Sequence, residues 1–135
     1  MRDVRSKRRK LTRLSGGAPQ LDVNSLWCRG LGEQLWKFEL LLDEAEGEHW
    51  TYRRNPHVRR ELRTVVNRSP EGIPYLAPEI QLLYKAKSAR PRDAADFEAV
   101  VPHLSVDARA WLRQSLASTL PSHPWTPKLE CHREA

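Results

Sequence analysis

Apolar and polar residues follow a helical period over the last part of the chain. From residue 77 to residue 121 apolar side chains recur every three or four positions, as on an amphipathic helix. Pro78 suits the first turn of a helix because its fixed φ is already helical. Arg90-Pro91 ends that helix, since a residue before proline is pushed out of the α region. The first helix then carries an apolar stripe that runs toward a basic end: Ile80, Leu83, Tyr84 and Lys87.

The same reasoning predicts two further helices. Asp93 can act as the N-cap of a helix that follows Pro91, with Asp96 in its first turn. Ser105 is a good N-cap for a last helix, which Pro121 ends. That helix places its apolar residues on one face: Ala108, Trp111, Leu112, Leu116 and Leu120. We therefore expect residues 77–121 to be helical and residues 122–135 to be a tail.

Upstream, aromatic and β-branched runs predict strands at 21–28, 35–42 and 50–54. A Gly-containing segment at 29–32 and the acidic segment 43–48 separate them and suit turns. Residues 58–66 fit a strand or a short helix equally well. Taken together, the pattern predicts an α+β fold, with a small antiparallel or mixed sheet in residues 21–76 followed by the helical part.

Composition adds a basic N-terminal segment to this picture. The 135 residues carry a net charge of +6, and their mean hydropathy is -0.68. Residues 1–13 hold much of the positive charge, so we expect residues 1–20 to be a basic, disordered arm. Such an arm could bind nucleic acid or simply be solvated, and no aromatic residue is interleaved to stack on bases. Its basic residues are Arg2, Arg5, Lys7, Arg8, Arg9, Lys10 and Arg13.

Hydropathy and cysteine content indicate where in the cell the chain is expected. No segment approaches the roughly 18 apolar residues of a membrane span, so no membrane partner is expected. Cys28 and Cys131 lie far apart and outside any metal-binding spacing. We interpret them as free thiols in a reducing cytoplasm. His103, His123 and His132 have no acid or thiol at catalytic spacing and are expected on the surface.

A cluster of cations marks the junction between the first two predicted helices. Four basic residues fall within the eight positions 85–92, and two carboxylates, Asp93 and Asp96, lie beside them. Lysine offers a mobile point charge and arginine a planar fork, both suited to phosphate oxygens. The alternative is a solvated helix end followed by a capped helix. The phosphate-binding candidates are Lys85, Lys87, Arg90 and Arg92, with Asp93 and Asp96 in support.

Upstream arginines offer a possible extension of this surface. Arg53, Arg54, Arg59 and Arg60 could add phosphate-binding groups, while charges on an exposed strand edge are the alternative explanation.

The order of several motifs resembles a known family. Residues 74–87 read Pro-Tyr-Leu-Ala-Pro-Glu-Ile-Gln-Leu-Leu-Tyr-Lys-Ala-Lys, and residues 90–97 read Arg-Pro-Arg-Asp-Ala-Ala-Asp-Phe. With segments 26–29, 36–43, 50–59 and 122–125, they resemble the C-terminal part of bacterial nucleotidyltransferase-fold proteins related to aminoglycoside and lincosamide adenylyltransferases. The resemblance covers roughly residues 11 to 125. It implies transfer of a nucleoside monophosphate from a nucleoside triphosphate to a hydroxyl of a small acceptor, with Mg²⁺ held by carboxylates.

The resemblance also shows what is missing. Such proteins carry an Asp-x-Asp metal pair after a Gly-Gly or Gly-Ser turn, and this sequence has no Asp-x-Asp. Gly16-Gly17 is followed by a single acid, Asp22, at the wrong spacing. The resemblance implies Glu39 as the remaining catalytic carboxylate, with Asp43 as the alternative, on the strand predicted at 35–42. Glu39 would be a metal ligand only if the acidic pair were supplied elsewhere.

These observations predict a truncated or degenerate nucleotidyltransferase-like protein that does not transfer nucleotides as this chain alone. Mg²⁺ and a nucleoside triphosphate are its implied cofactors, although neither is expected to bind tightly without the metal pair. A partner chain that supplies the missing half is a second hypothesis. Nucleic-acid binding through residues 1–13 is the alternative from a different functional class.

Overall fold

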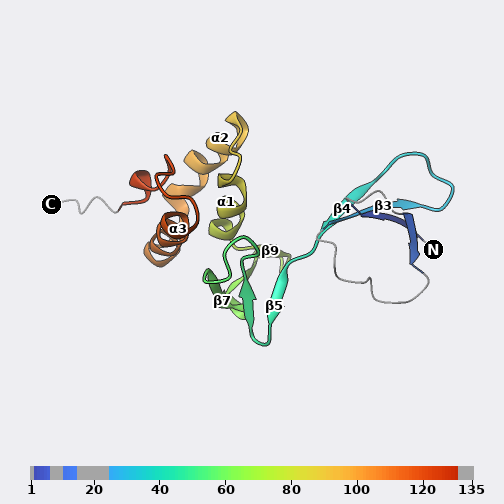
Figure 1. The fold of residues 1–135 in the computed structure, drawn as a ribbon, viewed down its shortest axis with the longest axis horizontal. Coiled ribbons are helices and arrows are strands. Elements are labelled where there is room, and N and C mark those ends of the chain that lie inside the picture. Colours follow the sequence, from blue (N-terminus) through green and yellow to red (C-terminus); the bar gives the residue numbers. More distant parts are fainter. Residues whose placement is uncertain (1, 7–10, 15–24, 131–135) are drawn as a thin grey trace. The chain divides into compact units, whose positions relative to one another are not determined.

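The computed structural model describes residues 2–6, 11–14 and 25–130 (Figure 1). The chain divides into two compact units, Met1–Glu44 and Ala45–Ala135. Small antiparallel sheets come first and three α-helices follow, so the predicted α+β class is confirmed. Within the described residues, no helix has both the length and the apolar character needed to cross a membrane. Gly16-Gly17 and Cys131 lie outside the described residues.

The first unit contains a four-stranded sheet with strand order β2-β1-β3-β4. Every neighbouring pair in this sheet is antiparallel. Residues 2–6 and 11–14, which we expected in a basic arm, are the strands β1 and β2, and the rest of that segment is not described. Leu26 and Cys28 are buried in this unit, with Leu42 packed against them. The four strands are β1 (Arg2–Ser6), β2 (Leu11–Leu14), β3 (Ser25–Gly30) and β4 (Phe38–Leu41).

Strand β4 is shorter than the strand predicted at 35–42. The chain turns back after β3, where the Glu33 carboxylate accepts a hydrogen bond from the Gly30 N–H at 3.0 Å. Lys37 lies 2.8 Å from the same carboxylate. These contacts fold the start of the predicted strand into the loop, and Leu35 is left 80% exposed. Two apolar residues of β4, Phe38 and Leu40, are also exposed.

The second unit contains two small sheets, and the turn predicted at 43–48 is confirmed only at its end, residues 47–48. Glu44–Glu46 forms strand β5, and a tight turn at Gly47, with φ of 57°, connects it to β6 (His49–Thr51). A three-stranded sheet in the order β5-β6-β7 results. Residues 58–66 contain both predicted alternatives in succession, strand β7 (Arg59–Glu61) and a 3₁₀ turn at Leu62–Thr64. The second sheet is an unpredicted hairpin of β8 (Val66–Arg68) and β9 (Pro74–Leu76).

Three helices complete this unit: α1 (Pro78–Ala86), α2 (Pro91–Val100) and α3 (Val106–Thr119). The predicted start at Pro78 is confirmed, and so is the Ser105 cap, whose hydroxyl accepts from the Ala108 N–H at 3.1 Å. The predicted cap at Asp93 is wrong. Arg90 is the N-cap of α2, because Pro91 fits the first helical position, and Asp93 is the third helical residue.

Aromatic residues link the strands to the helices in the core of the second unit. Trp50 and Tyr52 are fully buried together with Leu83 of α1 and Leu116 of α3. The segment predicted as a tail joins this core as well. Trp125 is 5% exposed and stacks on Phe97 of α2, with ring centroids 4.3 Å apart. The described part of the tail is therefore a structural part of the helical unit.

Candidate anion-binding site

Asp93 holds two cations at the turn between α1 and α2. Its side chain is 1% exposed, and its Oδ1 lies 2.9 Å from the Lys85 Nζ. The Arg90 Nε lies 2.8 Å from Oδ2 of the same carboxylate. Lys85 also reaches Oδ2 of the half-exposed Asp96, at 2.7 Å. We call these four residues, Lys85, Arg90, Asp93 and Asp96, the Asp93 cluster.

The electrostatics of the Asp93 cluster favour the charged forms of Asp93, Lys85 and Arg90. Hydrogen bonds from Arg90 and then from Lys85 hold the pKa of the Asp93 carboxyl well below its usual range. The carboxylates of Asp96 and Asp93 in turn raise the pKa of the Lys85 ammonium. Asp93 also raises the pKa of Arg90. The cluster is therefore an ion-pair network that links two helices, and its two cations are already neutralised.

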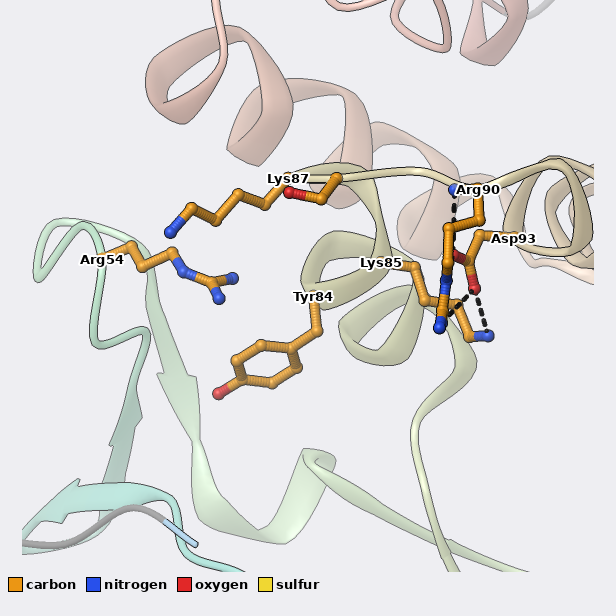
Figure 2. Close-up of a pocket in the computed structure, with 7 residues that line it drawn as sticks. Arg54, Tyr84, Lys85, Lys87, Arg90 and Asp93 are labelled. Carbon is orange, nitrogen blue, oxygen red and sulfur yellow. Dashed lines mark hydrogen bonds and ion pairs between the residues drawn. The ribbon is translucent and has the colours of Figure 1, made fainter. Parts of the chain in front are cut away.

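A pocket of about 360 Å³ opens beside the Asp93 cluster. Figure 2 shows its lining residues, with dashed lines where Lys85 and Arg90 meet Asp93. The Lys87 side chain, at the C-terminal end of α1, extends in the opposite direction, toward Arg54. Arg54 comes from the turn after β6. The pocket is lined by Arg54, Tyr84, Lys85, Lys87, Ser88, Arg90 and Asp93.

Arg54 and Lys87 differ from the cations of the Asp93 cluster. Among the described residues neither forms an ion pair, and both side chains are exposed. The Arg54 Nη1 donates a hydrogen bond to the Tyr52 hydroxyl at 3.0 Å, which orients the guanidinium but leaves its charge unopposed. The acid that lines the cavity, Asp93, is paired with Lys85 and Arg90, so the charges of Arg54 and Lys87 remain to attract an anion.

Tyrosine rings form the support beneath these cations. The rings of Tyr52 and Tyr84 meet edge to face, with centroids 5.2 Å apart. Tyr52 is fully buried, whereas Tyr84 is half-buried and lines the pocket. Because Tyr52 is fixed in the core, its hydrogen bond to Arg54 positions the guanidinium beside the pocket.

The predicted phosphate-binding residues are only partly brought together. Lys85, Lys87 and Arg90 line one pocket, whereas Arg92 is exposed on the first turn of α2 and does not line it. Of the supporting acids, Asp93 lines the pocket and Asp96 does not. From the sequence, Arg54 was only a possible extension of the phosphate-binding surface. Its position two residues after the buried Tyr52 is the feature that could have indicated its place beside the core.

Arg60, proposed with Arg54 as a phosphate-binding group, has a structural role instead. Its Nη1 lies 2.7 Å from the Oε1 of Glu79, whose side chain is 7% exposed. Its guanidinium also lies 5.0 Å from the centre of the Trp111 ring. The arginine thereby ties strand β7 to helices α1 and α3, and its charge is matched within the fold.

His123 is half-buried, which corrects the expectation of a surface position. Its Nε2 lies 3.0 Å from the Ala86 carbonyl oxygen, and its Nδ1 accepts a hydrogen bond from the Trp125 N–H at 3.2 Å. Because Nδ1 accepts, the proton resides on Nε2 and is donated to Ala86. His123 therefore connects the tail to the end of α1.

The candidate carboxylates of the nucleotidyltransferase resemblance lie in the first unit. Glu39 is in β4, and Asp43 follows that strand, whereas the pocket belongs to the second unit. The part of the chain that the structure describes contains no group of three or more His, Cys, Asp or Glu residues placed to hold a metal ion. No protein-family model, curated protein or solved structure matches this chain.

Proposed function

We propose that the second unit binds an oligophosphate, such as the triphosphate of a nucleotide, in the pocket between Arg54 and Lys87. The chain would then be a nucleotidyltransferase-like protein that retains phosphate binding and does not transfer nucleotides by itself. One observation carries this proposal: two cations from separate elements extend toward one cavity and have no acidic partner among the described residues.

The chemistry of the pocket lining suits phosphate. An arginine guanidinium grips two phosphate oxygens in a planar fork, and a lysine ammonium adds a mobile point charge. Two residues that carry hydroxyl groups, Tyr84 and Ser88, also line the pocket. The volume of about 360 Å³ falls within the range of small-molecule sites, roughly 300–1,000 Å³.

Transfer would require further groups. In the mechanism that the resemblance implies, carboxylate-bound magnesium positions the triphosphate and the acceptor hydroxyl. The acid that lines this pocket, Asp93, is engaged by Lys85 and Arg90. A partner chain that supplies acidic residues would therefore be needed for catalysis, and we propose binding alone for this chain.

Titration of ATP by calorimetry tests the binding proposal. We expect Lys87→Gln and Arg54→Gln each to weaken binding about tenfold, since a hydrogen bond to an ionised group contributes roughly 1.5–3 kcal/mol. Arg92→Gln is the matched control, because it removes the same charge from an exposed position outside the pocket. Absence of ATP binding in the wild type, or equal affinities in all four proteins, would refute the proposal.

Lys85 is unsuited to this test although it lines the same pocket. Its removal would leave the buried Asp93 with Arg90 as its remaining ion-pair partner and would disturb the α1–α2 turn. A loss of ATP binding in Lys85→Ala would therefore report on folding as much as on phosphate contact.

Nucleic-acid binding through the N-terminus is a second candidate, supported by the basic run at residues 7–10 between β1 and β2. Deleting residues 1–13 would remove both strands from the four-stranded sheet. Replacing Lys7, Arg8, Arg9 and Lys10 by Gln preserves the strands and removes four charges. We expect this variant to bind a DNA duplex more weakly and with a shallower dependence on salt concentration. Unchanged binding would count against the candidate.

A further inference from the structure

We infer that the pocket binds its oligophosphate without a divalent metal ion. This inference rests on the proposed function and specifies the ligand: a bare, fully charged phosphate chain rather than its magnesium complex. It runs against the magnesium dependence that the nucleotidyltransferase resemblance implies.

Both oxygens of the pocket carboxylate are occupied. Oδ1 of Asp93 accepts from the Lys85 Nζ at 2.9 Å and from the Arg90 Nη2 at 3.3 Å. Oδ2 accepts from the Arg90 backbone N–H at 3.0 Å and from the Arg90 Nε at 2.8 Å. A carboxylate offers about four lone-pair sites, so these four hydrogen bonds use its whole accepting capacity.

A metal ion beside Asp93 would also meet strong repulsion. The ammonium of Lys85 and the guanidinium of Arg90 are the nearest groups to that carboxylate. A divalent cation would have to displace at least one of them, and the displaced cation would then face the metal in a partly buried position. The buried ion pairs therefore exclude a metal from the acid they surround.

The remaining acid of the cluster does not provide a substitute. Asp96 gives its Oδ2 to Lys85 at 2.7 Å and does not line the pocket. Mg²⁺ is normally held by one or two carboxylates together with phosphates, in near-octahedral geometry. The pocket offers ammonium, guanidinium and hydroxyl groups, which are donors to an anion and, apart from the hydroxyls, have no lone pair for a metal.

The charge of the ligand follows from this arrangement. Arg54 and Lys87 must neutralise the phosphates directly, so the attraction grows with the negative charge that the ligand brings. Magnesium bound to the phosphate chain neutralises two of those charges and so weakens the attraction to the two side chains. Chelation of magnesium should therefore leave binding intact or strengthen it.

Calorimetric titration of inorganic triphosphate into the full chain tests the inference, once with excess EDTA and once with excess MgCl₂ at matched ionic strength. We expect the affinity in EDTA to equal or exceed the affinity in MgCl₂, and Lys87→Gln to lower the affinity in EDTA about tenfold. Weaker binding in EDTA than in MgCl₂ would overturn the inference while leaving the proposed function in place. Absence of binding in both buffers would overturn both.

A parallel titration with ATP in EDTA separates the two sources of the phosphate chain. Tighter binding of ATP than of inorganic triphosphate would identify a nucleotide as the ligand. Equal affinities would identify the phosphate chain itself as the recognised group. This titration identifies the ligand, and the comparison of EDTA with MgCl₂ decides the role of the metal.

Discussion

The Lys85 ammonium lies 2.9 Å from the Asp93 carboxylate, and this ion pair closes the turn between helices α1 and α2. Arg90, the N-cap of α2, binds the same carboxylate, whose side chain is 1% exposed. A charge buried in this way is stable only with its partners in place, because removing one partner leaves the others unmatched. The Asp93 carboxylate therefore links α1 to α2 in addition to their shared apolar core.

Replacing that acid should destabilise the second unit. We expect Asp93→Asn to lower the midpoint of thermal unfolding by several degrees, because a neutral amide cannot balance two cations. Asp96→Asn is the matched control, since it removes the same charge from a half-exposed partner of Lys85. Its effect on the midpoint should be smaller. Equal midpoints for the two variants, measured by circular dichroism, would contradict this role.

Acid pH should produce the same loss in the wild type. Contacts with Arg90 and Lys85 lower the pKa of Asp93 in the folded state, whereas in the unfolded chain it is about 3.9. The carboxylate therefore contributes stability above about pH 4, and the contribution is lost as pH falls through the folded-state pKa. Asp93→Asn should thus show a shallower loss of stability below about pH 4 than the wild type.

Urea unfolding of the wild type and of Asp93→Asn, measured at a series of pH values around and below pH 4, checks this difference in acid stability. The raised pKa of Lys85 acts at the other extreme, where its contribution is present below about pH 10.4 and is lost as pH rises further. Between these limits the Asp93 cluster should give a constant contribution. Parallel acid curves for wild type and Asp93→Asn would show that another group governs acid unfolding.

The Arg60–Glu79 ion pair offers a second test of the same fold. Glu79→Ala should reduce the free energy of unfolding by about 3 kcal/mol, because it leaves a partly buried guanidinium without its acid. Replacing both residues, Arg60→Met with Glu79→Leu, should restore part of this loss since no buried charge remains. A double variant less stable than Glu79→Ala would count against charge matching as the reason.

Trp125→Ala tests whether the tail belongs to the core. We expect a loss of about 3–5 kcal/mol in the free energy of unfolding, because the ring is stacked on Phe97 and is 5% exposed. Ile73→Ala, at a side chain that is 62% exposed, should change stability by no more than about 0.5 kcal/mol. A Trp125→Ala protein as stable as the wild type would separate the tail from the core.

Local chemistry was sufficient for some of these elements. Pro78 and Ser105 mark the starts of α1 and α3 because a fixed φ and a hydroxyl acceptor act within a single turn. Asp93 was predicted to be the N-cap of α2. It lies in the first turn of that helix, but it is paired with Lys85, which belongs to another helix. Such a contact depends on how two helices pack, which residue spacing does not specify.

The candidate site was also predicted only in part from the sequence. Four nearby cations predicted a phosphate-binding surface, yet their order along the chain gave no indication of which ones the fold neutralises. Arg54 reaches the pocket from a turn more than thirty positions away from Lys87 in the sequence. The tail was predicted wrongly because this short, proline-rich segment has no hydrophobic period, and Trp125 packs on Phe97 and His123, contacts that depend on the tertiary fold.

The Tyr52 hydroxyl orients Arg54 toward the pocket, whereas the helices are held by other contacts. The charges of Lys85 and Arg90 are balanced within the Asp93 cluster, so the net positive charge of the pocket comes from Lys87 and from Arg54 in the turn that follows β6. A Tyr52→Phe substitution would keep the aromatic core and release the guanidinium. Evolution could in this way retune the affinity of the pocket for anions at one hydroxyl while the helical scaffold stays unchanged.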